Sequence, residues 1–178
     1  MFYKTQIISL VVITFFASFS FASDTGQLYA GMYPDDFWRN TEILNSVASW
    51  AGKPMTFGGT FLDASEDPSN IMEKLEQAWQ AQSTPFANIE VSGNTSSVAN
   101  GSLDSEIMNL ATSVKAWLDK GQGRSLIIAP MQEMNLQESR WGCDAANFPT
   151  AFRKFVSAFQ QVGIDNDTQV RWAFAPNG

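Results

Sequence analysis

Short apolar runs of strand length alternate with amphipathic stretches of helix length along most of the chain. The strand-like runs span residues 28–33, 55–61, 85–91, 126–129 and 170–175. The helix-like stretches between them span residues 36–50, 67–79, 103–117 and 149–162, and their apolar side chains recur every three or four residues. This alternation predicts an α/β fold with a parallel sheet whose connections are right-handed crossovers.

Two architectures share that alternation: a doubly wound open sheet and a closed (β/α)8 barrel, the TIM barrel. A doubly wound nucleotide-binding sheet has a glycine-rich turn after its first strand, but this chain has Pro34-Asp35-Asp36 there and no G-x-G-x-x-G motif. We therefore expect a TIM barrel. A complete barrel takes roughly 250 residues, so the chain is expected to supply about the first five of its eight units. A doubly wound binding domain unrelated to sugars stays an alternative.

The first 22 residues have the pattern of a secretory signal peptide. Lys4 supplies one positive charge, residues 7–19 are almost wholly apolar, and Ser20-Phe21-Ala22 is a small-x-small exit. The apolar core is shorter than the ~20 residues that a membrane span needs. We expect cleavage after Ala22, a mature domain over residues 23–178 that does not bind membranes, and a secreted or periplasmic location.

The composition excludes several classes of function. Signal cleavage would remove one of 11 basic residues and none of the 18 acidic ones, so the net charge would move from −7 to −8, which disfavours nucleic acid as a partner. The chain has no histidine and one cysteine, Cys143, which excludes histidine triads, imidazole metal sites and internal disulfides. We expect no metal and no cofactor, and a chemistry that runs on carboxylates, amides, hydroxyls and aromatic rings.

The segment richest in chemistry follows the fourth strand. The run 126–129 leads into a polar loop that contains Glu133, Asn135 and Trp141. Residues just past the carboxyl end of a parallel strand face the ligand side of the sheet. There a carboxylic acid can protonate a glycosidic oxygen, an amide can bind a hydroxyl group, and an indole can stack on a sugar ring. An ordinary loop with a solvated glutamate fits this segment equally well.

With these segments in view, the chain resembles glycoside hydrolase family 26, the (β/α)8-barrel family best known for endo-β-mannanases. Four segments carry the resemblance, in chain order: Asn-Gly-Ser-Leu-Asp at 100–104, Glu-Met-Asn at 133–135, Trp141, and Trp-Ala-Phe-Ala-Pro-Asn at 172–177. The resemblance implies a retaining hydrolase of β-linked polysaccharides or oligosaccharides, with Glu133 as the general acid/base. β-Mannan is the default substrate, and mixed-linkage glucan and xylan stay open.

The chain departs from the family pattern at Gln132, which stands where the family has a histidine beside its acid/base. We expect Gln132, Asn135 and Trp141 to bind substrate, with Trp141 as a stacking platform. The family's nucleophile is a second glutamate at the end of the seventh strand, which the resemblance puts beyond Gly178. The alternative function is a non-catalytic or inactive carbohydrate-binding remnant of such a barrel.

The remaining expectations concern packing. Glu133 is expected to be partly buried against Met131 and Met134, and the polar segment 92–102 is expected to be a surface loop. Four other acids are expected to be solvated or structural, the third as a helix cap: Asp63, Glu66, Asp67 and Glu90. Three tryptophans lie on apolar helix stripes and are expected in the core: Trp50, Trp79 and Trp117.

Overall fold

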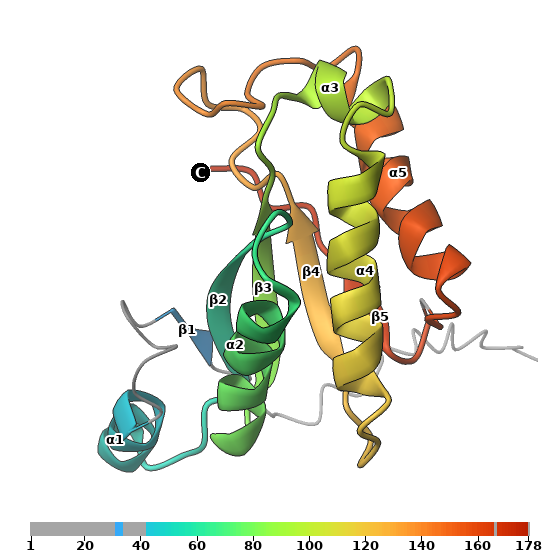
Figure 1. The fold of residues 1–178 in the computed structure, drawn as a ribbon. Coiled ribbons are helices and arrows are strands. Elements are labelled where there is room, and N and C mark those ends of the chain that lie inside the picture. Colours follow the sequence, from blue (N-terminus) through green and yellow to red (C-terminus); the bar gives the residue numbers. More distant parts are fainter. Residues whose placement is uncertain (1–30, 34–41, 166, 178) are drawn as a thin grey trace, which may run out of the picture.

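Five parallel strands form one sheet in the order in which they occur along the chain (Figure 1). The structure, a computed structural model, describes residues 31–33, 42–165 and 167–177, so the predicted signal peptide and the turn at 34–36 lie outside it. The strands are β1 (Gly31–Met32), β2 (Phe57–Asp63), β3 (Thr84–Glu90), β4 (Leu126–Pro130) and β5 (Val170–Trp172). The predicted α/β fold with a parallel sheet is confirmed.

Helices connect consecutive strands, and they are α1 (Glu42–Ala51), α2 (Pro68–Gln80), α3 (Thr95–Ala99), α4 (Asp104–Leu118) and α5 (Phe148–Gln161). Asp67 caps α2 as predicted, because its carboxylate accepts a hydrogen bond from the N–H of Ser69 at 2.8 Å. The segment 92–102 is not a plain loop. Asn94 caps the short helix α3 inside it by accepting a hydrogen bond from the N–H of Ser97 at 2.9 Å, a capping signal that the loop prediction overlooked.

The helices α2, α4 and α5 pack side by side against one face of the sheet (Figure 1). Successive side chains of a strand point to opposite faces. On β3, Ala87 and Ile89 are fully buried beneath these helices, whereas Phe86 and Asn88 point the other way and are only half-buried. Neither α2, α4 nor α5 covers that second face of the sheet.

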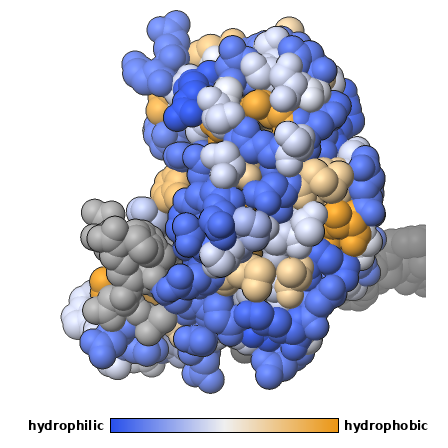
Figure 2. Space-filling view, in the orientation of Figure 1, coloured by the Kyte–Doolittle hydropathy of each residue, from blue (hydrophilic) through white to orange (hydrophobic). Residues whose placement is uncertain are grey.

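The outer surface of the helix layer is mostly hydrophilic (Figure 2). This is the pattern of amphipathic helices whose apolar stripes face a sheet. An ion pair between Lys154 of α5 and Asp104 of α4, with Nζ and Oδ2 2.8 Å apart, links two neighbouring helices at this surface. No helix in the described ranges is long and apolar enough to cross a membrane.

The helix tryptophans do not all reach the core. Trp117 is fully buried, and Trp79, which packs against the same core, meets it edge to face with ring centroids 6.2 Å apart, as predicted. The prediction for Trp50 is wrong, because its side chain is 88% exposed. Leu44 is the buried residue of α1. At 3.6 residues per turn, Trp50 lies on a different face of the helix from Leu44. Trp172 of β5 packs toward α5, with its ring centroid 5.1 Å from that of Phe159.

Candidate functional site

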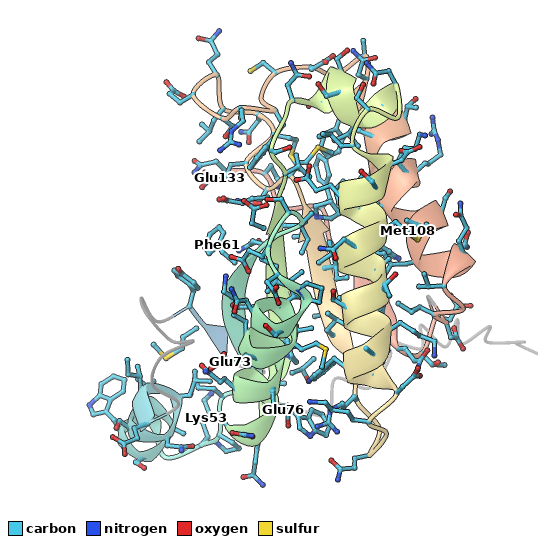
Figure 3. The ribbon with its side chains drawn as sticks, in the orientation of Figure 1. Lys53, Phe61, Glu73, Glu76, Met108 and Glu133 are labelled. Carbon is cyan, nitrogen blue, oxygen red and sulfur yellow. The ribbon has the colours of Figure 1, made fainter. Side chains whose placement is uncertain are left out.

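The carboxyl end of the sheet carries a hollow of about 360 Å³. Its lining residues come from the end of β3 and from the loop after β4: Glu90, Gln132, Glu133, Glu138, Ser139, Arg140 and Trp141. The parallel pairing of β3 with β4 brings them together, because the carboxyl ends of both strands meet at one edge. Figure 3 shows Glu133 at this end of the sheet, on the side away from α4 and α5. Three of the four predicted site residues therefore line one hollow.

The backbone of the loop after β4 is strained. Met131, Glu133 and Cys143 have φ angles of 51°, 55° and 56°, in the left-handed region that non-glycine residues rarely adopt. Two short hydrogen bonds hold this path: the N–H of Glu133 donates to the Ala175 carbonyl at 2.7 Å, and the N–H of Cys143 donates to the Met134 carbonyl at 2.7 Å. Such strain costs about 1–3 kcal/mol per residue and clusters at functional sites.

The carboxylate of Glu133 is exposed, while its neighbours Met131 and Met134 are buried. The expectation that Glu133 is partly buried between these methionines is therefore wrong. Both methionine side chains pack into the core, and the left-handed backbone at residue 133 turns the carboxylate outward. Its Oε1 accepts a hydrogen bond from Nδ2 of Asn177 at 2.9 Å. The acid is thus accessible to a ligand and oriented by an amide.

Asn135 holds the segment that follows β5. Its Nδ2 donates to the carbonyl of Asn177 at 2.8 Å, and its Oδ1 accepts from the N–H of Asn177 at 2.8 Å. This reciprocal pair places the side chain of Asn177 against Glu133. The structure therefore gives Asn135 a role in positioning the acid, and sugar binding by Asn135 stays a prediction.

Trp141 lies in a different setting from the one predicted. Its side chain is only 6% exposed and belongs to the main hydrophobic core. Its Nε1–H donates to the carbonyl of Gln132 at 2.7 Å, and its own carbonyl accepts from Oγ1 of Thr95 at 2.7 Å. The expectation of an open stacking platform is wrong, because the indole is used to anchor the loop. Contact of its rim with substrate stays a prediction.

Gln132 lines the hollow and is 9% exposed. Its Oε1 is buried and accepts no hydrogen bond from any described residue. A buried amide oxygen without a donor costs about 1–3 kcal/mol. Most buried polar groups in folded proteins have a hydrogen-bond partner, so this oxygen is an exception to the usual pattern.

Of the four acids assigned structural or solvated roles, three have local partners. Asp63 accepts a hydrogen bond from the N–H of Ser65 at 2.9 Å, and Glu66 forms an ion pair with Lys74. Hydrogen bonds from the hydroxyl and then the N–H of Ser69 lower the pKa of Asp67.

Glu90 differs from the other three acids, because it lines the hollow with Glu133. A signal for this was present in the sequence: Ile89 and Val91 are apolar neighbours in a strand, so Glu90 between them points to the helix-free face.

No model of a known protein family matches the chain, and no curated protein matches it.

Proposed function

We propose that this chain carries the acid/base half of a retaining glycoside hydrolase site, in a secreted or periplasmic protein that cleaves β-linked glycans. We further propose that the sheet is part of the wall of a (β/α)8 barrel. Two features support the barrel: the strands follow chain order, and α2, α4 and α5 lie on one face. A doubly wound sheet reverses its strand order at a switch point and has helices on both faces.

One contact carries the proposed function: the hydrogen bond of 2.9 Å between Nδ2 of Asn177 and Oε1 of Glu133. Glu133 and Asn177 belong to two segments that resemble the same hydrolase family and that are 44 residues apart in sequence. When an amide donates a hydrogen bond to one carboxylate oxygen, it fixes the orientation of the carboxylate group and so the direction in which the second oxygen points. This is the arrangement that a positioned general acid needs.

In the proposed reaction, Glu133 donates a proton to the leaving glycosidic oxygen and later takes a proton from the attacking water. Asn177 orients the carboxyl group, and Asn135 holds Asn177 in place. A retaining mechanism also needs a second carboxylate about 5–5.5 Å from the first, which the family resemblance assigns to a later strand. β-Mannan is the default substrate of this proposal, with mixed-linkage glucan and xylan as alternatives.

The test replaces Glu133 by Gln in the intact protein. Glu133→Gln keeps the shape and removes the transferable proton, so hydrolysis of glycans with poor leaving groups should fall by roughly 10²- to 10⁴-fold. With aryl glycosides that have good leaving groups, the rate of the first step, cleavage of the glycosidic bond, should fall less. Azide should partly restore the rate of the second step, attack on the glycosyl-enzyme intermediate. Turnover is measured by the release of reducing ends from mannan, glucan and xylan.

Glu73→Gln is the matched control, because Glu73 is an exposed carboxylate on α2, remote from the hollow (Figure 3). It should turn over glycans at the parent rate. Unchanged hydrolysis in Glu133→Gln would contradict the proposed function. Binding of β-glycans without hydrolysis by the parent protein would favour the alternative of a non-catalytic carbohydrate-binding domain.

A further inference from the structure

A second hollow lies at the amino end of the strands, on the face of the sheet that α2, α4 and α5 leave uncovered. It has a volume of about 390 Å³, and its described lining residues are Phe57, Thr84, Ser125, Leu126, Ile127 and Arg171. The sheet register brings them into line, because Phe57 pairs with Thr84 and Ile127 pairs with Arg171. We call this site the basic hollow, since Arg171 is the charged residue among those that line it.

The guanidinium group of Arg171 has no partner in the described part of the chain. Arg171 is exposed, and neither a hydrogen bond nor an ion pair joins its side chain to another described residue. The hydroxyl groups of Thr84 and Ser125 likewise make no hydrogen bond to a described residue. The other arginines in the described ranges each donate to a protein oxygen: Arg124, Arg140 and Arg153.

The charge of Arg171 is not neutralised by the sheet. The chain has 18 acidic and 11 basic residues, yet no acid is among the described residues that line the basic hollow. Glu90 lies on the same face, but Arg171 is level with Phe86, four residues before Glu90. At about 3.3 Å per residue this offset is ~13 Å along the strands, and β4 lies between the two residues, so they are too far apart for an ion pair.

We propose that the basic hollow binds a small monocarboxylate with an apolar body, such as an aryl acid. The guanidinium fork of Arg171 donates two parallel hydrogen bonds to the carboxylate. The hydroxyl groups of Thr84 and Ser125 supply further donors. The side chains of Phe57 and Ile127 contact the apolar body. The volume of the hollow lies in the range of small-molecule sites, about 300–1,000 Å³.

A single cation is matched to a single negative charge. A dianion such as hydrogen phosphate would keep an uncompensated charge beside a protein of net charge −7, and it would make no use of the apolar walls. A neutral ligand would leave Arg171 without a charged partner. The inference goes beyond the proposed hydrolase function and does not rest on it, because the basic hollow lies at the opposite end of the strands from Glu133.

The experiment titrates the intact protein with 3-phenylpropionate and follows the backbone amide signals by NMR. A ligand of about ten non-hydrogen atoms should bind with a Kd of roughly 1 mM or below. The shifted signals should cluster at the strand starts around Thr84, Ser125 and Arg171. Arg171→Met keeps most of the side-chain length and removes the charge, so binding should weaken by roughly 10-fold or more, the scale of a lost hydrogen bond to a charged group.

Two further variants and two further ligands separate the contributions. Ser125→Ala removes a hydroxyl donor and keeps the charge, so binding should weaken by about 2- to 10-fold. Arg153→Met is the matched control, because Arg153 is an exposed arginine of α5 that does not line the hollow, and it should bind like the parent. The neutral isostere 3-phenylpropionamide and hydrogen phosphate should each bind the parent roughly 10-fold more weakly than 3-phenylpropionate, or not at all.

The inference is overturned if 3-phenylpropionate gives no saturable shifts up to about 10 mM, if the amide or phosphate binds as tightly, or if Arg171→Met binds like the parent. Ser125→Ala applies the same test if Arg171→Met does not fold. A carboxylate beside an apolar group also occurs at the C-terminus of a peptide, so N-acetylalanylphenylalanine is the last probe. Tighter binding than that of 3-phenylpropionate would assign peptide ends as the source of the carboxylate, and weaker binding would assign free acids.

Discussion

Trp141 ties the loop after β4 to the rest of the protein. Its Nε1–H bonds to the carbonyl of Gln132, its carbonyl bonds to Thr95 at the start of α3, and its ring is buried in the core. The guanidinium carbon of Arg140 lies 6.0 Å from the centroid of the ring. One side chain therefore couples the candidate acid to the helix layer.

The anchoring role predicts a stability effect at residue 141. Trp141→Phe removes the indole N–H and leaves the buried Gln132 carbonyl without its donor, so the free energy of unfolding should fall by about 1–3 kcal/mol. Trp141→Ala should cost about 3–5 kcal/mol, because it also opens a cavity. Urea unfolding followed by circular dichroism measures both values.

Trp50→Phe serves as the control for the Trp141 variants, because Trp50 is 88% exposed. This substitution should change the free energy of unfolding by less than about 0.5 kcal/mol. If Trp141→Ala keeps the stability of the parent but binds glycans more weakly, the anchoring role is contradicted. The result would instead support Trp141 as a stacking platform.

At the scale of elements, Arg124 joins α2 to α4. Its guanidinium carbon lies 5.3 Å from the ring centroid of Trp79 and 5.4 Å from that of Trp117. Its Nη2 also donates to both carboxylate oxygens of Glu76, at 2.9 and 3.0 Å. Lys120 adds a contact with Glu76 at 3.1 Å. This cluster joins the two helices at the end of the sheet opposite the hollow (Figure 3).

The cluster makes stability depend on pH. Burial acts to raise the pKa of Glu76, but hydrogen bonds and charge from Arg124 and Lys120 outweigh it and hold that pKa below its ordinary value of 4.5. A carboxyl whose pKa is lower in the folded state stabilises the fold fully above the unfolded pKa. It loses that contribution as pH falls through the folded pKa.

Glu76→Gln should therefore lower the free energy of unfolding by about 2–3 kcal/mol at pH 7, because Arg124 loses a charged partner. The difference from the parent should shrink below pH ~4.5. Urea unfolding across the acid range measures it, with the exposed Glu73→Gln on the same helix as control. A difference that stays constant down to pH ~2 would contradict the predicted pKa shift.

At the scale of the whole molecule, the two faces of the sheet differ, because α2, α4 and α5 cover only one of them. Beneath α2, α4 and α5 the strand residues are fully buried, whereas residues on the other face, such as Phe57, Phe61 and Phe86, are half-buried. In the proposed barrel this second face is the interior, and the hollow at the carboxyl end of the strands is part of the active-site mouth.

Export is the prediction that concerns the whole chain. The signal pattern predicts cleavage between Ala22 and Ser23, so protein recovered outside the cytoplasm should begin at Ser23 when its N-terminus is sequenced. Ala22→Arg should block cleavage, because the signal peptidase requires a small residue there. Exported protein that still begins at Met1 would contradict the prediction.

Much of the fold was predictable from local patterns. The strands β2, β3 and β4 and the helices α2, α4 and α5 follow the predicted alternation, with boundaries that shift by one or two residues, as for β2 at Phe57–Asp63. β1 lies within the predicted run 28–33, of which residues 28–30 lie outside the described part of the chain. Hydrophobic periodicity and capping act within a few residues, so they can be read along the chain. The prediction for β5 was too long: Ala173 still donates to the Ile128 carbonyl, but the chain then leaves the sheet toward Glu133.

The sequence by itself determined the alternating α/β pattern, the acidic and histidine-free composition, and the position of Glu133 and Asn135 just after the fourth strand. Only the tertiary structure decided that Asn177 orients Glu133, that Trp141 is buried and that Glu90 shares the hollow. The physical reason is distance along the chain. These contacts join residues about 40 or more positions apart, which packing brings together and which no local periodicity encodes.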